Sequence, residues 1–401
     1  MSHPLQSKPP GAAGAELPLE SRWERTIGEV RVLFGQGALE ELGLMVRSTG
    51  ASHALLVTDR GLTRAGHPRR ARTVLEDASI RTSVFDEVEE NPSSQQVEAA
   101  ARRLSPTSID CIIALGGGSC LDFAKGLNFL LTNGGKMEDY WGWGKARKPM
   151  MRSVGIPTTA GTGSDGQSYA VIKRSSDQRK MACGDPKVRF RRVILDPDLT
   201  ATVPRPVKAA TGFDAISHAV ESFASNNRTA ESQSFSKSAW QLLEANFAAA
   251  FDPKTESRIL SSMLIGAHLA GAAIEQSMLG AAHACANPLT ARFGMTHGLA
   301  VAVMLPHVVR HNSAADENPY QGLFDITVGS GENPKSTAED LAARLESLRR
   351  IAGLPSKLSA QAIPHRALRE LAQAATDEWT AQFNPRPMSA ADFLEVYEQA
   401  F

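Results

Sequence analysis

The chain has 401 residues, enough for two or three domains, and its 42% hydrophobic and 21% charged residues are typical of a globular protein. Its 43 basic and 43 acidic residues give a formal net charge of zero, which argues against binding nucleic acid through bulk charge. Four cysteines without CxxC spacing, no secretory leader pattern and no apolar run of about 18 residues favour a cytoplasmic protein without a membrane span.

The first half of the chain alternates between strand-like and helix-like segments. Residues 1–22, with four prolines and little periodicity, are expected to form a loose or extended tail. Short apolar runs then alternate with amphipathic segments, which predicts a parallel, Rossmann-like α/β sheet with right-handed crossovers. The expected strands lie at 26–34, 53–58, 81–86, 111–115, 152–159, 167–174 and 188–196, and the expected helices at 38–48, at 94–104 and directly after 115.

The second half is almost entirely helix-like and rich in alanine and leucine. We therefore expect an all-α unit and place the boundary near residue 200, which gives a tail at 1–22, an NAD-binding α/β domain at 23–200 and a helical metal-binding domain at 201–401. Helices are expected at 205–224, 229–250, 255–279, 297–312, 336–352 and 364–377.

A glycine run, Gly116-Gly117-Gly118-Ser119, separates a buried strand from a helix. Glycines let the backbone approach a phosphate, and the free N–H groups at a helix start favour an anion, although an ordinary tight turn fits the run equally well. A second run at 161–166 matches the dinucleotide pattern GxGxxG. The strand-like segment QSYAVIKR follows it where a helix is required, so that we reject this match.

Two further features point to a nicotinamide cofactor. The segment PTTAGTG, 157–163, is rich in hydroxyls and glycine and is expected to wrap around a cofactor, with a plain surface loop as the alternative. Asp59 closes an expected strand, where a carboxylate accepts from ribose hydroxyls and repels a 2′-phosphate. This position favours NAD(H) over NADP(H), with a solvated helix-start aspartate as the alternative.

Asp214 and His218 lie four positions apart in GFDAISHAVES, which places both on one face of a helix. A carboxylate and an imidazole so placed can bind a divalent cation, and His283 and His297 are candidate partners. This set of oxygen and nitrogen donors suits Fe(II), Zn(II), Mn(II) or Co(II). Any one of these histidines taken alone is more often a structural residue. Glu221 lies on the same face and is a candidate partner for a ligand.

Taken together, the motifs resemble those of the iron-containing (group III) alcohol dehydrogenase family. The resemblance covers nearly everything after residue 25. It rests on FGQGALEELG, VTDRGL, EENPS, ALGGGSCLDFAKG, IPTTAGTGSD, LDPDLTATVP, GFDAISHAVES and HACANPLTARFGMTHGLAVAVMLPHV.

The resemblance implies an α/β nucleotide domain and a helical domain with the site between them. It implies oxidation of alcohols or reduction of aldehydes and ketones with NAD(H) or NADP(H), Fe(II) or alternatively Zn(II), and a dimer or larger homo-oligomer in which the N-terminal strand pairs across subunits. The implied metal ligands are Asp214, His218, His283 and His297. Together with Gly117 of the glycine run, the implied cofactor contacts are Asp59, Asn91, Gly118, Ser119, Thr158, Thr159, Thr162, Val171 and Lys180.

One departure bears on proton transfer. Many relatives carry a second histidine four residues after the third ligand, where this chain has Asn287. Because an amide is no general base, no catalytic protein base is assigned, and the proton is expected to leave through water and the nicotinamide ribose. The substrate also stays open. The segment Tyr140–Lys145 is a candidate for the cleft mouth, although a solvated loop with two packed tryptophans is the favoured reading.

Sibling activities on the same scaffold are the main alternatives. They are a maleylacetate-type or polyol-type reductase and a lyase that resembles dehydroquinate synthase. The lyase is disfavoured because only Arg292 is basic between His283 and His297. A non-catalytic scaffold protein is the remaining alternative, and four intact candidate ligands argue against it.

Overall fold

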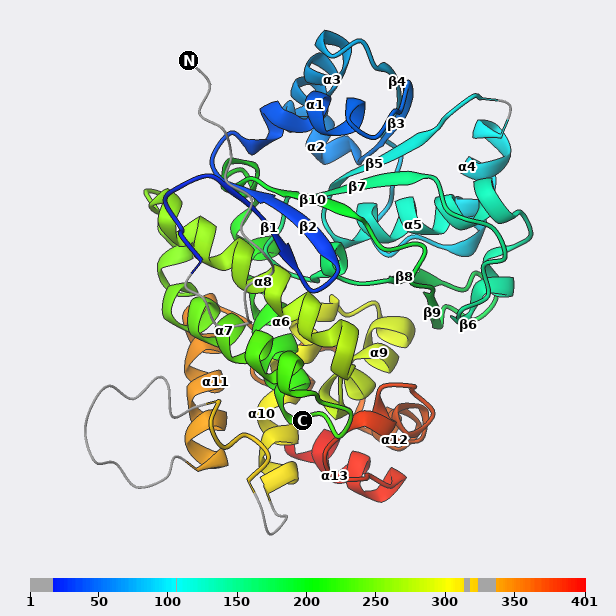
Figure 1. Ribbon diagram of the computed structural model, residues 1–401. Coiled ribbons are helices and arrows are strands. Elements are labelled where there is room, and N and C mark those ends of the chain that lie inside the picture. The colour runs from blue at the N-terminus through cyan, green and yellow to red at the C-terminus, as the bar shows by residue number, and fades with distance from the viewer. Residues whose placement is uncertain (1–16, 106, 314–317, 324–336) are drawn as a thin grey trace.

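The computed structural model describes residues 17–105, 107–313, 318–323 and 337–401. Residues 1–16 of the expected tail lie outside this range. The first half forms a seven-stranded sheet in the order β1-β2-β10-β7-β5-β3-β4, parallel except for the β1–β2 pair, and thereby confirms the predicted α/β fold (Figure 1). Its strands are β1 (Trp23–Ile27), β2 (Val30–Phe34), β3 (His53–Val57), β4 (Arg81–Phe85), β5 (Cys111–Gly116), β7 (Arg152–Pro157) and β10 (Arg192–Leu195).

The single extended segment expected at 26–34 was wrong. The chain reverses at Gly28, where φ is +55°, and β1 pairs with β2 in an antiparallel hairpin. Glycine adopts this left-handed conformation without steric cost, which allows so short a reversal. The hairpin places β1 at one end of the sheet.

Both faces of the sheet are covered by helices, as a parallel sheet requires. Ile113 and Leu115 of β5 belong to a core shared with α1 and α3, whereas Ile112 and Ala114 belong to the core on the opposite face, shared with α4 and α5. Successive side chains of a strand point to opposite faces, so that one apolar strand contributes to both cores. The helices of this half are α1 (Leu42–Arg47), α2 (Arg60–Ala65), α3 (His67–Asp77), α4 (Ser94–Leu104) and α5 (Gly118–Asn133).

A small second sheet, in the order β6-β9-β8, was only partly expected. The strand-like segment 167–174 contains β8 (Tyr169–Lys173), but β6 (Gly142–Trp143) and β9 (Lys180–Gly184) were not predicted. Gly184 is required here because a Cβ atom on it would lie 2.4 Å from the ring of Tyr169 and 2.6 Å from that of Trp143. The two aromatic rings therefore pack over the glycine, with their centroids 5.1 Å apart.

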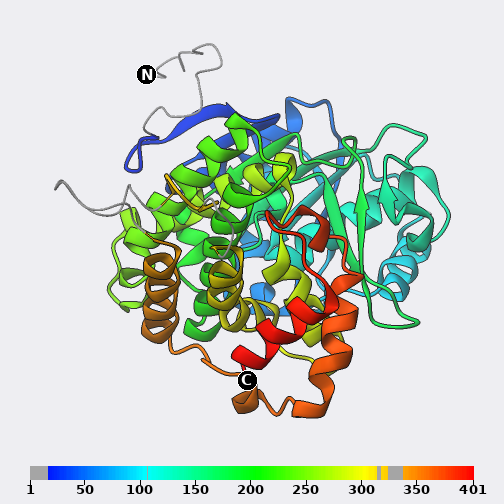
Figure 2. The ribbon, with the colours of Figure 1, turned by 90° about the horizontal axis from the view of Figure 1, so that it is seen from below.

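The second half consists of helices around a common core (Figures 1 and 2). Among the described residues, α8 is the one helix long and apolar enough to cross a membrane, and 83% of its apolar window is buried inside the fold, as in a core helix. The last helix, α13, was not predicted. The helices are α6 (Arg205–Ala224), α7 (Ala230–Asn246), α8 (Ser257–Ser277), α9 (Ala281–Phe293), α10 (His297–Ser313), α11 (Ala338–Ala352), α12 (Leu368–Thr376) and α13 (Ala390–Gln399).

Candidate active site between the two halves

The cofactor candidates gather at the carboxyl edge of the large sheet. After β3 the chain adds β4 on one side, and β5 then pairs with the other side of β3, so that the strand order reverses at β3 and β5. Ligands of open parallel sheets bind outside the carboxyl ends of strands at such a reversal. Asp59 follows β3 and the glycine run follows β5, so that both lie at this point.

The glycine run brings the backbone close to its neighbours. A Cβ atom on Gly118 would lie 2.5 Å from the side chain of Thr162, so that only glycine allows the threonine loop to lie on the start of α5. The hydroxyl of Ser119 accepts a hydrogen bond from the backbone N–H of Asn91, 3.1 Å away. Four of the predicted contacts, which come from three separate segments, thus meet at the start of one helix.

The threonine loop is held from the helical half. Nδ1 of His268 on α8 lies 2.5 Å from Oδ2 of Asp165, and both residues are buried. Gly163 packs against the backbone of Gly271, where an added Cβ would come within 2.5 Å. The rejected GxGxxG match is confirmed as a decoy, since β8 follows the short turn at its end. Its residues instead fix the loop that carries the predicted Thr158, Thr159 and Thr162.

Asp59 is also the N-cap of α2, as in the alternative weighed for it. Its Oδ1 accepts from the N–H of Leu62 at 2.9 Å, and its Oδ2 accepts from the thiol of Cys120 at 3.5 Å. A carboxylate has about four acceptor positions, so that both contacts leave room for a ribose hydroxyl. The capping role and a cofactor role are therefore compatible.

Val171 and Lys180 come from neighbouring strands of the small sheet and line the same cleft. Burial lowers the pKa of the Lys180 ammonium, while the negative charges of Asp214 and Glu378 act in the opposite direction. Lys180 therefore lies between the small sheet and the helical half, within electrostatic reach of the candidate metal cluster.

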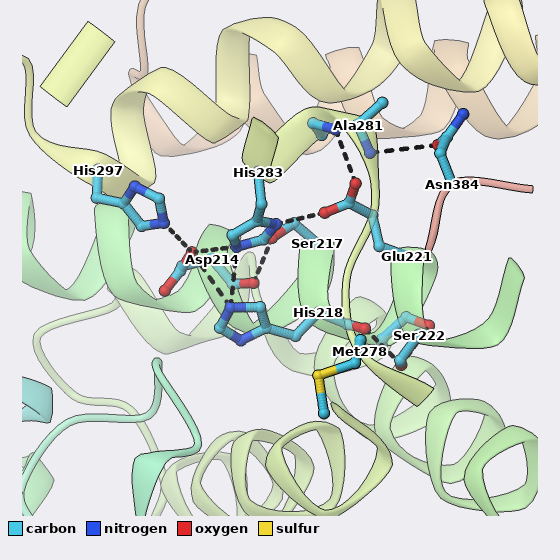
Figure 3. A network of polar contacts seen from close by, with 12 residues as sticks. Asp214, Ser217, His218, Glu221, Ser222, Met278, Ala281, His283, His297 and Asn384 are labelled. Atoms are coloured by element: carbon cyan, nitrogen blue, oxygen red, sulfur yellow. Dashed lines mark hydrogen bonds and ion pairs between the residues drawn. The ribbon is translucent and has the colours of Figure 1, made fainter. Parts of the chain in front are cut away.

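Three helices supply the candidate metal cluster. Asp214 and His218 lie one turn apart on α6, His283 lies in the first turn of α9, and His297 begins α10. The chain ends α9 at Gly294, where φ is +65°, and returns to place His297 beside His283, with ring centroids 5.2 Å apart. Figure 3 shows the four side chains pointing toward one another.

The donor atoms of this cluster lie close to the spacing that a shared cation requires, and those of Asp214, His283 and His297 lie within 4.8 Å of one another. Oδ1 of Asp214 lies 3.5 Å from Nε2 of His218, 3.6 Å from Nε2 of His283 and 3.9 Å from Nε2 of His297. The two Nε2 atoms of His218 and His283 are 3.1 Å apart. Atoms that bind one ion at about 2.1 Å and about 90–110° apart are themselves about 3.0–3.4 Å apart.

The cluster also contains a buried oxygen that needs a partner. Within the described part of the chain, Oδ1 of Asp214 has no hydrogen bond, although Asp214 is only 4% exposed. A buried carboxylate oxygen without a partner is costly. A divalent cation bound there would remove this cost, and the oxygen and nitrogen donors fit Fe(II) or Zn(II).

Glu221 orients one of the histidines. Its Oε2 accepts from Nδ1 of His283, and its Oε1 accepts from the N–H of Ala282 at 2.8 Å (Figure 3). Oδ1 of Asn384 accepts from the N–H of Ala281, so that side chains from other segments cap the start of α9. With Nδ1 donating to Glu221, Nε2 of His283 is left as the atom that faces Asp214.

The pKa values follow from burial and from the charges within the cluster. Burial alone would raise the pKa of Asp214, but His218 and the other two histidines hold it far below its usual range. Burial lowers the pKa of His218 to about 4. His283 is different: burial opposes its protonation, yet Glu221 and Asp214 raise its pKa to about 9.

All fourteen predicted site residues line one cleft, whose volume is about 1730 Å³. This volume exceeds the roughly 300–1,000 Å³ of a typical small-molecule pocket, so that a dinucleotide and a substrate can be held together. The structure therefore brings the predicted cofactor residues and the predicted metal cluster into a single continuous site.

The lining residues that were not predicted include Tyr169, Trp379 and Thr380. Trp379 and Thr380 follow α12, and the rings of Trp379 and Tyr169 stack with centroids 5.9 Å apart across the cleft. No residue of Tyr140–Lys145 is among the described residues that line the cleft, which counts against this segment as the cleft mouth. The alternative of a loop with two packed tryptophans holds only in part, since Trp143 lies in β6 and is 52% exposed. A lone tryptophan after a helix carries no sequence signal for such a position.

Comparison with known proteins supports the same assignment. Residues 29–197 match the family model described as iron-containing alcohol dehydrogenase, and residues 208–401 match that of the C-terminal part of the same family. The chain is 31% identical to the 1,3-propanediol dehydrogenase of Citrobacter freundii over 377 residues, which cover 92% of this chain and 96% of the relative. It is 28% identical to the NAD-dependent methanol dehydrogenase of Bacillus methanolicus over 370 residues, with 92% and 97% covered.

A solved structure shows the same fold. The crystal structure of a 1,3-propanediol oxidoreductase superposes with a TM-score of 0.88 at 29% identity and covers 92% of this chain and 97% of that one. The fold, the interdomain cleft and both family matches lead to one conclusion. The chain belongs to the iron-containing alcohol dehydrogenase family and is a metal-dependent alcohol dehydrogenase or aldehyde reductase.

Proposed function

We propose that the chain uses NAD(H) to interconvert an alcohol and its aldehyde or ketone at a divalent cation, Fe(II) or alternatively Zn(II). The observation that carries this proposal is the single cleft lined both by the phosphate-type loop at Gly118 and by the cluster around Asp214. A shared cleft would place a nicotinamide and a substrate beside the cation site within reach of each other.

Each part of the cleft has a role in this proposal. The start of α5 and the threonine loop bind the pyrophosphate, with Asp59 and Asn91 on the ribose side. Asp214, His218, His283 and His297 would hold the cation, which would supply Lewis-acid chemistry for the substrate oxygen. Val171, Lys180 and the helical half position the nicotinamide and exclude water, because rigid placement of the reacting groups supplies much of the rate.

The preference for NAD(H) over NADP(H) depends on Asp59. Its carboxylate lines the cleft beyond β3, where it would repel a 2′-phosphate. Arg60 and Arg64 line the same part of the cleft and would attract one, so that the preference follows from the balance of these charges. Steady-state kinetics with NADH and NADPH test it. A higher kcat/KM with NADPH would contradict the proposal.

The decisive experiment is an anaerobic screen of aldehydes and ketones for NADH oxidation. The protein is first stripped with a chelator, and Fe(II) or Zn(II) is then added back. We expect activity only after metal is returned, and metal analysis of the purified protein should find bound iron or zinc. Full activity in the stripped protein would contradict metal-assisted chemistry.

The sibling activities remain the second candidate. A lyase that acts on a phosphorylated acid needs several cations around the metal, and Arg292 is instead paired with Glu370, 3.2 Å away, outside the cleft lining. Reductases for polyols or maleylacetate-like acids use the same hydride chemistry. The carbonyl panel separates them by substrate.

We also propose the division of labour within the chain. Residues 23–200 would bind NAD and residues 201–401 the metal, after a tail at 1–22. A homodimer or larger homo-oligomer is proposed because β1 is the terminal strand of the sheet and a second copy can extend it. Four free thiols fit a cytoplasmic protein. Light scattering during size exclusion tests the oligomer, and a monomeric mass would contradict it.

A further inference from the structure

Asn287 and Glu378 form a hydrogen-bonded pair beside the candidate metal cluster. Asn287 lies on α9 four residues after His283, so that both side chains lie on one face of the helix, one turn apart. Asn287 is 7% exposed and lines the cleft. Its Nδ2 atom donates to Oε2 of Glu378 at 2.9 Å. A carboxylate therefore lies directly behind the cleft wall at its metal end.

Glu378 belongs to the segment between α12 and α13, and the next two residues, Trp379 and Thr380, line the cleft. Burial raises the pKa of Glu378, whereas the hydrogen bond from Asn287 opposes the rise. The other charged or titratable groups that act on Glu378, or that it acts on, are Arg179 just before β9, Lys180 on β9, Asp377 beside it and Tyr397 on α13.

We propose that Glu378, held in place by Asn287, is the proton acceptor for the metal end of the cleft during alcohol oxidation. This inference rests on the proposed function. Oxidation of the alcohol passes a hydride, with two electrons, to the nicotinamide and releases the hydroxyl proton. The O–H bond breaks, a water molecule in the cleft carries the proton, and the Glu378 carboxylate becomes a carboxylic acid that later loses the proton to solvent.

Asn287 has a positioning role in this step. Its amide is no general base, but its N–H group fixes the direction of the Glu378 carboxylate. The imidazole that many relatives carry at this position would place a titratable group there directly. In this chain the titratable group is instead Glu378, which lies behind Asn287 and is hydrogen-bonded to it.

The Glu378→Gln variant separates proton transfer from structure. Glutamine keeps an oxygen that accepts from Asn287, so that the contact remains while the ability to take up a proton is lost. We expect kcat for alcohol oxidation to fall about 100-fold, the lower end of the range for general acid–base catalysis, with loss of the acid limb of the pH–rate profile. The matched control, Asp377→Asn, removes the neighbouring exposed carboxylate and should keep the wild-type kcat. Its acid limb should remain and move only toward lower pH, because the charge of Asp377 raises the pKa of Glu378.

A Glu378→Gln enzyme with the wild-type kcat and pH profile would overturn the proposal, and so would an equal loss in Asp377→Asn. A second readout does not need activity. Infrared difference spectra of the full chain, wild type minus Glu378→Gln, follow the Glu378 carboxyl during a pH titration. A titration midpoint above 4.5, the ordinary pKa of a glutamate, supports the pair even where no substrate is found, provided that the midpoint shifts in Asn287→Ala. A midpoint at or below 4.5 overturns it whatever the activity.

Discussion

The two halves of the molecule build their parts of the site in different ways. The α/β half uses backbone and small side chains in loops, as at Gly118 and Thr162, which meet at the carboxyl edge of a sheet. The helical half uses large polar side chains in the interiors of helices, as at Asp214 and His283, both 4% exposed. We expect a change of shape to lower the affinity of a loop site, and loss of one donor to lower the affinity of a buried polar cluster by a larger factor.

Under the proposed function, the difference follows from what each half would bind. An extended dinucleotide is held by many weak contacts, including N–H groups at a helix start, and each is replaceable. A cation needs a few donors at fixed distances, and burial makes any unsatisfied donor costly. We therefore expect substitutions in the helical half to have the larger effects.

The strongest test of this comparison is Asp214→Asn. The amide keeps the size of the side chain but removes the negative charge that faces three histidines. We expect metal affinity to fall more than about 100-fold, because substitution of a residue that only supports a ligand already lowers metal affinity by up to about 100-fold. Elemental analysis of the purified protein measures the bound metal. Asp177→Asn, at an exposed aspartate in the turn between β8 and β9, is the control and should keep its metal. Stoichiometric bound metal in Asp214→Asn would contradict the larger sensitivity that we expect of the helical half.

A buried lysine tests whether the α/β half has an equally sensitive interior. Nζ of Lys125 on α5 donates to the carbonyls of Ser164 and Tyr169 and to the Ser164 hydroxyl. Lys125→Met leaves these acceptors without a donor and should lower the free energy of unfolding by about 3 kcal/mol, with metal content unchanged. Urea unfolding measures it. Lys208→Met removes a single hydrogen bond, to the carbonyl of Ala250, and should lower the free energy of unfolding by less.

The same lysine gives a pH dependence. Burial lowers the pKa of Lys125 from 10.5 to about 8 in the folded protein. Between these pH values the unfolded chain binds a proton that the folded chain does not, so that this group makes stability rise with pH across the window. The rise should be absent in Lys125→Met. Identical slopes of stability against pH in both proteins would show that Lys125 keeps its proton when buried.

Glu221→Gln sharpens the comparison within the helical half. Glutamine still reaches Ala282 and His283 but loses the charge that holds the imidazole, and we expect metal affinity to fall by about 10-fold to 100-fold. Competition with a chromogenic chelator measures the affinity. Glu244→Gln, at a buried glutamate paired with Arg344, is the matched control and should bind metal as the wild type does. Equal metal affinities for both variants would show that Glu221 does not support the metal site.

The smallest effect is expected at the loop site. Gly118→Ala places a Cβ 2.5 Å from the Thr162 side chain, and the threonine loop must shift at a cost of about 1–2 kcal/mol, seen as a roughly 10-fold weaker binding of NADH. Gly117→Ala meets only Thr159 at 3.4 Å and should weaken binding less. Fluorescence titration with NADH measures both. A larger loss in Gly117→Ala would contradict this interpretation of the loop.

The sequence by itself determined most of the fold. Alternating apolar runs and turn residues predicted the parallel sheet, and the long alanine-rich segments predicted the helices, among them 205–224, which agrees with the bounds of α6. These signals are local, since burial of one face repeats every two residues in a strand and every three to four in a helix. The glycine run and the aspartate–histidine pair are equally local, so that the order of residues along the chain is enough to recognise both.

Only the tertiary structure decided which residues meet. The pairing of β6 with β9, the hydrogen bond between His268 and Asp165, and the pairing of Asn287 with Glu378 all depend on contacts between segments far apart in the chain. Glu378 lies 91 residues after Asn287, and no periodicity links them. Hydrogen bonds and distances between donor atoms depend on three-dimensional packing. Sequence spacing predicts them only where both partners lie on one helix or in one turn.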